Sequence, residues 1–343
     1  MNCCIECFHD AQIRDMIRTA NKIGDCNFCG GKSVPVYPVD DQSDLSDLIS
    51  GVISVYEEFD EGESLFQLLV NDWHIFNSTL PSSYKLVEAF AGVIFGGKGA
   101  EYNKNVRVPR TFSEKYGIFS GHSWAEFSKE IKTQNRFHND FFKPDQLASF
   151  LTYSTSKYRK GTAFYRARIC ESMVGYAIEE MGAPPLRKRK PGRVNPEGIG
   201  IFYLTSDMET ALNEVRASAF DFVSIGEFRL KKDISVINIS SLNEISPVLY
   251  SSGLESLAAN ISIFGDISKE ISKPLRRSDS LLEYLPTQYI TEFIKSKGYA
   301  GVEYTSTMGT GGRNIAVFDE SLFVGVSVHN VEIKTIRYCY NNL

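Results

Sequence analysis

The pattern of apolar and polar residues changes about half-way along the chain. Between about residues 40 and 157, apolar residues recur at intervals of three and four positions, which is typical of amphipathic helices. The stripes run through Leu45, Leu48, Ile49 and Val52, through Leu65, Leu68, Leu69 and Trp73, through Leu86, Phe90 and Val93, and through Trp124, Phe127 and Ile131. We therefore expect a mostly helical module over residues 38–157.

From about residue 158 onward, strand and turn signals appear between helical patterns. Residues 164–169 alternate, so Arg166 and Arg168 share one face of the expected strand while Tyr165 and Ala167 share the other. Two arginines on one face suit either a solvated edge or a clamp for a diphosphate, because the guanidinium group is a planar fork of donors. Further strands are expected over 199–204, 301–306 and 313–318, which predicts a mixed α+β fold for the whole chain.

One helix of this second half carries a candidate acidic residue. Ser206 and Glu209 have the spacing of a capping box, which predicts that the helix begins there. Glu214 follows in the same helix, and small side chains at neighbouring helical positions leave room beside it for a ligand. These small neighbours are Thr210, Ala211, Ala217 and Ser218. On this pattern alone, a binding role and a structural role for Glu214 both stay open.

Composition limits the classes of function. With 343 residues the chain is expected to hold two or three domains. The 43% of hydrophobic residues indicates a globular protein, and a formal charge of −5 disfavours nucleic acid as its main partner. No apolar run approaches the roughly 20 residues that span a bilayer, and the N-terminus lacks the basic and apolar segments of a secretory signal. We expect a cytoplasmic protein that does not enter a membrane.

Five of the seven cysteines lie in the first 29 residues. Cys4 and Cys7 form one Cys-x-x-Cys pair, and Cys26 and Cys29 form another, with 18 residues between the pairs. Two such pairs can complete a tetrahedron of thiolates around a structural zinc ion. The alternatives that stay open are a redox pair, cysteines without a shared role, and a site in which Cys3 replaces Cys4; His9 is a weaker competitor as ligand. The spacer is expected to be helical, and a segment with so few apolar residues would depend on the metal to fold.

An ordered series of residues in the second half resembles the RES domain family, over about residues 160–320. The series is Tyr165, Arg166, Arg168, Gly192, Arg193, Asn195, Pro196, Gly198, Tyr203, Ala211, Glu214, Val215, Thr287, Gln288, Gly301, Val302, Tyr304 and Ser306. The resemblance implies an α+β fold like that of ADP-ribosyltransferase toxins and an enzyme that consumes NAD+. It assigns catalytic roles to Arg193, Glu214 and Ser306. It assigns NAD+-binding roles to Arg166, Arg168, Tyr203 and Asn195.

The first half is similar to the HEPN/RES N-terminal module that is fused to such domains. This similarity divides the chain into a zinc knuckle over residues 1–37, a HEPN-like helical module over 38–157 and a RES domain over 158–343. The helical module is then expected to act as a scaffold or sensor. Short RES proteins are toxins neutralised by an antitoxin, so the resemblance also implies an antitoxin or sensor partner and a role as a toxin or defence effector.

Two other classes of function stay open. One is an ADP-ribosyltransferase that modifies a macromolecule, and the other is a non-catalytic interaction protein that combines a zinc module with nucleotide binding. For the expected cleavage of the nicotinamide–ribose bond, the sequence does not choose among water, phosphate and a protein side chain as acceptor. It also leaves open whether the chain forms a homo-oligomer.

Overall fold

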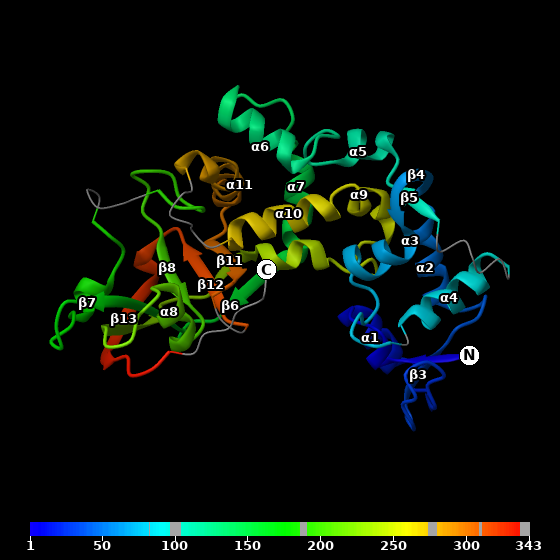
Figure 1. Cartoon of the computed structure of the whole chain (residues 1–343), viewed down its shortest axis with the longest axis horizontal. Helices are drawn as coiled ribbons and strands as arrows, with labels where there is room; N and C mark the ends of the chain where they lie inside the picture. Colours follow the sequence, from blue (N-terminus) through cyan, green and yellow to red (C-terminus); the bar gives the residue numbers. More distant parts are fainter. Residues whose placement is uncertain (82, 97–103, 186–190, 274–279, 309–310, 337–343) are drawn as a thin grey trace. The chain divides into compact units, whose positions relative to one another are not determined.

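The computed structural model describes residues 1–81, 83–96, 104–185, 191–273, 280–308 and 311–336 (Figure 1). The chain divides into two compact units. Unit 1 comprises Met1–Trp124, Asp140–Leu147 and Ser241–Gly265, and unit 2 comprises Ala125–Asn139, Ala148–Ser240 and Asp266–Leu343. Within the described residues, none of the helices is both long and apolar enough to cross a bilayer.

Unit 1 is mostly helical, as the apolar stripes predict. Its helices are α1 (Ala11–Thr19), α2 (Asp44–Ser54), α3 (Leu65–Gln67), α4 (Ser83–Ile94), α5 (Arg110–Tyr116) and α9 (Leu254–Ala258). The stripe that begins at Leu65 forms α3 and continues as a π-helical turn over Leu68–Asp72. An antiparallel pair of β4 (Glu57–Ser64) and β5 (Asn105–Arg107), which the periodicity does not predict, forms a second, two-stranded sheet.

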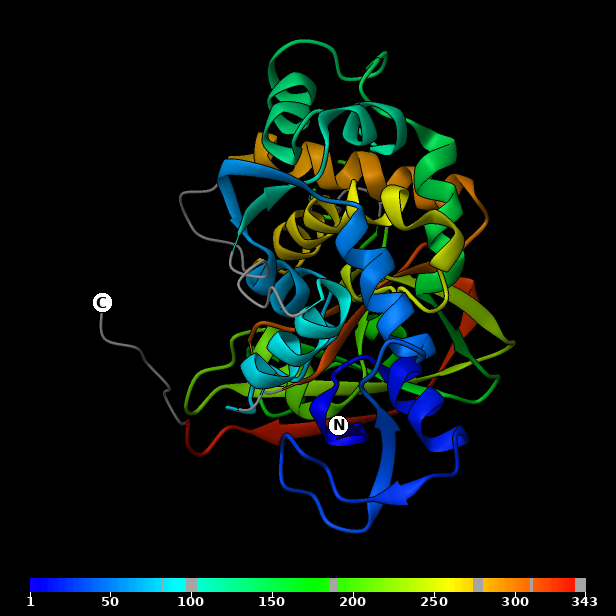
Figure 2. The ribbon, with the colours of Figure 1, turned by 90° about the vertical axis from the view of Figure 1, so that its right-hand side faces the viewer.

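The N-terminal segment forms a small antiparallel sheet, drawn in blue in Figure 2. Its strands are β1 (Asn2–Cys4), β2 (Ile23–Gly24) and β3 (Val34–Pro38), in the order β1-β3-β2. The expected helix in the spacer is α1, and Asp10 begins it by accepting a hydrogen bond from the backbone N–H of Ile13. Ile13 and Ile17 are fully buried, so α1 presents the predicted apolar face.

Over the part of unit 2 that the structure describes, one mixed sheet has eight strands in the order β13-β9-β7-β8-β12-β11-β10-β6. The strands are β6 (Thr155–Tyr158), β7 (Ala163–Cys170), β8 (Phe202–Thr205), β9 (Phe222–Leu230), β10 (Ile234–Asn238), β11 (Gly301–Thr305), β12 (Arg313–Val317) and β13 (Phe323–Glu332). Two described helices, α8 (Met208–Glu214) and α11 (Leu285–Ser296), lie entirely in unit 2. Three further helices have residues in both units: α6 (Trp124–Thr133), α7 (Pro144–Leu151) and α10 (Ile261–Ser272). The prediction of a mixed α+β fold is confirmed.

The sheet is split between β7 and β8. β7 pairs with β9 over eight residues, from Ala163 to Cys170, but it pairs with β8 only where Tyr165 lies opposite Thr205. Beyond that pair the two strands diverge, which opens space between them. The two faces of β7 have the predicted assignment, because Tyr165 and Ala167 pack with Ala211 whereas Arg166 lies over the ring of Phe202 on the other face.

Helix α8 begins one residue later than the capping-box pattern predicts. Asp207 is the N-cap, and its carboxylate accepts hydrogen bonds from both the N–H and the hydroxyl of Thr210. Ser206 instead donates to the Asp207 carboxylate and accepts from the N–H of Arg313 on β12. An aspartate caps a helix at least as well as a serine, so the residue with the stronger acceptor takes the position and Ser206 links the helix to the sheet.

Asp207→Ala is expected to lower the free energy of unfolding by about 1 kcal/mol at neutral pH. Burial opposes ionisation, but the donors of Thr210 and Ser206 outweigh it and hold the pKa of Asp207 below its usual 3.8. The higher free energy of unfolding of the wild type is therefore fully present above pH 3.8 and is lost as the pH falls through the lowered pKa of Asp207. Urea unfolding of both proteins at several pH values measures it, and a difference that does not change with pH would contradict a charged cap.

Candidate functional site

The sheet register aligns a row of polar side chains across four strands. Tyr304 on β11 lies opposite Asn314 on β12, Asn314 lies opposite Thr205 on β8, and Thr205 lies opposite Tyr165 on β7. Residues that are directly opposite in a ladder project from the same face of the sheet, so the four side chains line one surface. The C-terminal end of α8 reaches this surface through Glu214.

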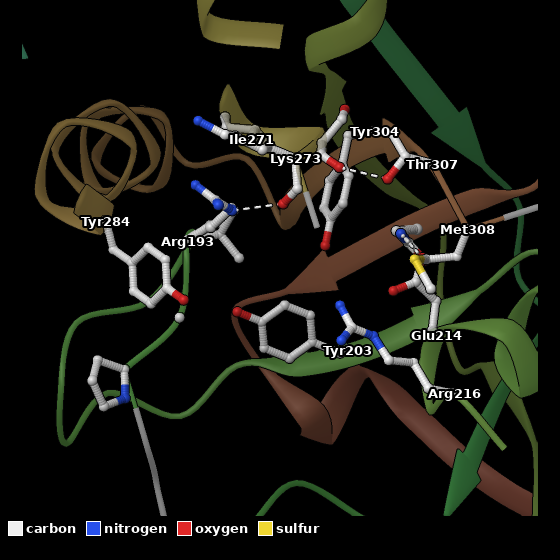
Figure 3. Close-up of a pocket in the computed structure, with 15 residues that line it drawn as sticks. Arg193, Tyr203, Glu214, Arg216, Ile271, Lys273, Tyr284, Tyr304, Thr307 and Met308 are labelled. Atoms are coloured by element: carbon white, nitrogen blue, oxygen red, sulfur yellow. Dashed lines mark hydrogen bonds between the residues drawn. The ribbon is translucent and has the colours of Figure 1, made fainter. Parts of the chain in front are cut away.

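Two donors hold one oxygen of the Glu214 carboxylate. The hydroxyl of Ser306 donates to Oε1 at 2.6 Å, and Nδ2 of Asn314 donates to the same oxygen at 2.7 Å. Among the described residues, none is hydrogen-bonded to Oε2, and Figure 3 shows the carboxylate turned toward a cavity. The arrangement fixes the orientation of the carboxylate and leaves its second oxygen available to a ligand.

Ser306 is itself held by the turn between β11 and β12. Its N–H donates to the carbonyl of Gly312, its hydroxyl accepts from the N–H of Met308, and its side chain is almost fully buried. A β-carbon at Gly312 would lie 1.8 Å from the hydroxyl of Thr210 on α8, so this close approach requires glycine. Ser306 lines neither cavity and therefore acts by holding the Glu214 carboxylate in place.

Two adjoining cavities, of about 430 Å³ and about 310 Å³, form a cleft over the row of polar side chains. Both are lined by Tyr203, Glu214, Tyr304 and Asn314, so Glu214 lies where they join. Burial, followed by the negative charge of Glu214, raises the pKa of Tyr304, whose hydroxyl therefore stays protonated at neutral pH. We refer to the larger and smaller spaces as the first and second cavity.

Among the described residues, three basic ones line the first cavity: Arg193, Arg216 and Lys273 (Figure 3). Nζ of Lys273 lies 3.3 Å from a carboxylate oxygen of Glu270. Arg193 is fixed, since its Nε donates to the carbonyl of Lys273 at 2.7 Å and its guanidinium carbon lies 5.2 Å from the centre of the Tyr284 ring. Its Nη1 lies 3.8 Å from a carboxylate oxygen of Glu270. The first cavity thus combines cationic groups with aromatic rings, which suits a ligand with phosphate groups and planar rings.

Helix α11 holds the backbone that carries Arg193. The hydroxyl of Thr287 donates to the carbonyl of Arg193 at 2.6 Å, and Nε2 of Gln288 donates to the carbonyls of Gly192 and Asn195. Thr287 and Gln288 are both buried. Two adjacent side chains at the start of α11 therefore satisfy three backbone carbonyls of this loop and set the position of Arg193.

Arg166 borders the second cavity at the split between β7 and β8, while its guanidinium group lies over the Phe202 ring on the other face of β7. Its Nη1 donates to the carbonyl of Tyr203 at 3.1 Å, and no described residue accepts from its buried Nε. Burial, followed by the positive charge of Arg168, lowers the pKa of Arg166 from its ordinary value. A cation in this position is stabilised when an anion arrives, so the second cavity also favours a ligand with negative charge.

Comparison with protein families identifies the unit that contains this cleft. A family model described as the RES domain matches residues 164–340, slightly more than half of the chain. The chain belongs to the RES domain family. No curated protein sequence matches it. Among solved structures, the M. tuberculosis MbcT–MbcA toxin–antitoxin complex aligns with 54% of this chain and 92% of its own chain, at 12% identity and a TM-score of 0.33.

The RES domain brings most of the predicted site residues to one cleft. Arg193 and Glu214 line the first cavity, Arg166 lines the second, Tyr203 lines both, and Ser306 contacts Glu214. Their predicted roles in catalysis and NAD+ binding are not tested by this geometry, and we treat them below as parts of a proposal.

Two predicted NAD+-binding residues do not line either cavity. Arg168 donates to the carbonyl of Glu180 and lies 4.0 Å from the centre of the Tyr176 ring. Asn195 is buried and accepts from the hydroxyl of Tyr203 at 2.6 Å, while its Nδ2 donates to the carbonyl of Ile199. The structure therefore gives Asn195 a role in shaping the loop before β8 and leaves Arg168 outside the cleft.

Four further residues line the cleft without a role predicted from the sequence: Arg216, Lys273, Tyr304 and Asn314. Asn314 and Tyr304 carry no signal of their own, because only the pairing of β11 with β12 aligns them. Arg216 stands two residues after Glu214, and that proximity was the one available indication. Lys273 directly follows the last residue of α10, and it lines the cleft because that end of the helix lies there.

A second candidate site lies in unit 1, where the sulfur atoms of Cys4, Cys7, Cys26 and Cys29 are all within 4.8 Å of one another. Their closest separations are 3.3 Å from Cys4 to Cys29 and 3.5 Å from Cys7 to Cys26. Four thiolates placed tetrahedrally at about 2.3 Å from zinc lie about 3.8 Å apart, so the donor set and spacing fit a structural zinc ion.

The cluster also distinguishes Cys4 from Cys3. Cys3 is not among the four clustered sulfur atoms, and its thiol donates to the carbonyl of Tyr37. Around Cys26, the backbone N–H groups of Phe28 and Cys29 both point at its sulfur. Such N–H donors stabilise thiolate charge, which supports metal binding by the set that contains Cys4.

Proposed function

We propose that this RES domain cleaves the bond between nicotinamide and ribose in NAD+, as the resemblance drawn from the sequence implies. The observation that carries the proposal is Glu214: one carboxylate oxygen is fixed by Ser306 and Asn314, and the other faces a cleft with arginine side chains on both sides of it. A fixed anion between two cationic regions suits a substrate whose reacting sugar becomes positive while its diphosphate is negative.

The chemistry requires little acid catalysis. When the bond from ribose C1′ to the nicotinamide nitrogen breaks, its electron pair leaves with the nitrogen, and the cationic ring becomes a neutral leaving group. Positive charge then develops on C1′ and the ring oxygen of the ribose. We assign Oε2 of Glu214 to this charge, which it stabilises most in the transition state. The acceptor adds to C1′ through oxygen or another nucleophilic atom and releases a proton.

The other residues act in binding and orientation. Arg193 and Arg166 hold phosphate oxygens, for which the guanidinium fork is suited. Tyr203 packs against the nicotinamide or the ribose, and Tyr304 offers a protonated hydroxyl to the sugar. Ser306 and Asn314 act through Glu214, so we describe them as positioning residues. Arg168 is outside the cleft and has no part in this proposal.

Chromatography of the products tests the proposal and identifies the acceptor. The purified full-length protein is incubated with NAD+, with and without inorganic phosphate, and nicotinamide is quantified together with the ribose-containing product. Equal amounts of nicotinamide and free ADP-ribose indicate water as the acceptor, whereas a phosphorylated product that requires phosphate indicates phosphorolysis. Intact NAD+ after long incubation, with measurable binding, would contradict cleavage and favour the non-catalytic nucleotide-binding protein.

The same experiment separates an ADP-ribosyltransferase from these activities. In that case nicotinamide is released while ADP-ribose remains attached to a macromolecule, which NAD+ labelled in the adenosine half detects. An enzyme that drains NAD+ also requires restraint in its own cell. We therefore include in the proposal a toxin-like role with a neutralising partner or a sensing function of the helical module.

A further inference from the structure

Arg216 has a backbone conformation that favours glycine. Helix α8 ends at Glu214, and Arg216 follows in the left-handed region with a φ of 53°. The N–H of Arg216 donates to the carbonyl of Asn213, and the next N–H, that of Ala217, donates to the carbonyl of Leu212. Helices commonly end in this way with glycine, because a β-carbon is strained in the left-handed region. An arginine here requires a reason other than ending the helix.

The side chain of Arg216 supplies that reason, since it lines the first cavity. Figure 3 shows its guanidinium group extending into the cavity from the side that carries Glu214, whereas Arg193 lies across the cavity. The left-handed turn thus places a cation two residues after the carboxylate and aims it at the same space. Strain of this kind, kept where a ligand would lie, is typical of binding sites.

We propose that Arg216 contacts the phosphate groups of the substrate and determines a preference for the dinucleotide over a nucleoside that has the same scissile bond. The inference rests on the proposed function for the identity of the substrate, and it adds a specificity-determining residue to it. Arg193 and Arg216 approach the first cavity from two sides (Figure 3). A diphosphate carries two negative charges, so two guanidinium forks on opposite sides match it better than one.

The first test compares two substrates, NAD+ and nicotinamide riboside, which lacks phosphate. Arg216→Gln is expected to lower kcat/KM for NAD+ by about 10- to 100-fold, the usual effect of losing hydrogen bonds to a charged group. The value for nicotinamide riboside should change much less, and Arg216→Lys should recover part of the loss through its charge. An equal loss for both substrates would overturn the assignment to phosphate.

Arg229→Gln is the matched control for this substitution. Arg229 lies on β9 of the same unit, is half exposed, and its Nε is 2.8 Å from a carboxylate oxygen of Glu227. It lines neither cavity. The same chemical change at this position should leave the preference between the two substrates at the wild-type value. A matching change in Arg229→Gln would show that overall charge, not contact, sets the preference.

Binding without turnover separates this inference from the proposed function. Calorimetry with ADP-ribose is expected to show about 10-fold or greater weakening for Arg216→Gln, whereas adenosine should bind wild type and variant alike. If the wild type binds ADP-ribose in this way but leaves NAD+ intact, the proposed reaction fails and the role of Arg216 stands. Equal affinity of ADP-ribose for both proteins would refute the role of Arg216.

Thermal unfolding excludes a structural explanation. Arg216→Gly removes both the guanidinium group and the strained β-carbon, so its melting temperature should equal that of the wild type or exceed it by about 2 °C. The loss of kcat/KM for NAD+ should nevertheless be as large as in Arg216→Gln. A melting temperature well below that of the wild type would mean that Arg216 stabilises the fold and would count against the proposal.

Discussion

Glu214→Gln is expected to reduce the rate of NAD+ cleavage by about 10²- to 10³-fold, the cost of removing one electrostatic group from a transition state. The amide is nearly isosteric with the carboxylate, and its oxygen can still accept from Ser306 and Asn314. The substitution therefore removes the negative charge that faces the ribose while it preserves the hydrogen bonds that fix the side chain. Single-turnover measurements of nicotinamide release give the effect on the chemical step.

Glu209→Gln is the control on the same helix. Glu209 is an exposed residue in the first turn of α8 and lines neither cavity, so its neutralisation should leave the rate of cleavage close to that of the wild type. Circular dichroism and urea unfolding should place both variants within about 1 kcal/mol of the wild type, as is usual for near-isosteric changes that keep their partners. Full activity in Glu214→Gln would remove the carboxylate from the mechanism.

Positioning of Glu214 explains why a buried serine and an asparagine belong to the site. Removing the Ser306 donor from Oε1 frees the carboxylate to rotate and changes which oxygen faces the cleft. Because Ser306 lines neither cavity, the effect should appear mainly in kcat. Ser306 is one of the residues in the family series and could be predicted from the sequence. Asn314 could not, because only the pairing of β11 with β12 places it opposite Tyr304.

Local patterns in the sequence predict the elements of unit 2 well, and their assembly less well. The alternation over residues 164–169 predicts β7 and the two faces that its residues occupy, since strand periodicity is a local property. The split between β7 and β8 is a property of two strands far apart in the sequence, and no periodicity within either one indicates it. The cleft that depends on this split could therefore not be predicted from either strand alone.

Competition between neighbouring residues accounts for the errors of detail. Ser206 and Asp207 can both begin α8, and the capping-box spacing favours the serine, but in the structure Asp207 has the better acceptor and Ser206 is used by β12. Arg168 matches a position of the family series, yet its side chain turns toward Tyr176. In both cases the outcome depends on a tertiary neighbour that the local sequence does not contain.

Grouping of distant segments is the other feature that local patterns miss. Residues Ser241–Gly265 belong to unit 1, although they lie between strands of the unit 2 sheet in the sequence. Within unit 1, Nδ2 of Asn260 donates to the carbonyl of Tyr116, and its Oδ1 accepts from the N–H of Ile118. A buried asparagine whose partners are in another segment gives no periodic signal, so the division of the chain into domains at residues 37 and 157 remains a prediction.

Removal of the metal is expected to unfold the N-terminal segment. Structural zinc in small Cys-rich modules contributes roughly 10–16 kcal/mol to folding at pH 7, which is more than the short β1-β3-β2 sheet and α1 can replace. We expect the purified protein to contain one zinc ion per chain, measured by elemental analysis. A strong chelator should then expose this segment to limited proteolysis, and added zinc should restore protection.

Cys26→Ser and Cys3→Ser form a matched pair for this prediction. Cys26 belongs to the cluster, so its replacement should abolish zinc binding and give the same proteolytic cleavage as the chelator. Cys3 lies outside the cluster, and a serine can still donate to the carbonyl of Tyr37, so this variant should retain zinc. If the protein lacked zinc and instead formed a reversible disulfide between two of the four cysteines, the redox alternative would replace the metal site. Equal zinc loss in both variants would assign Cys3 to the ligand set and contradict the geometry described for Cys4.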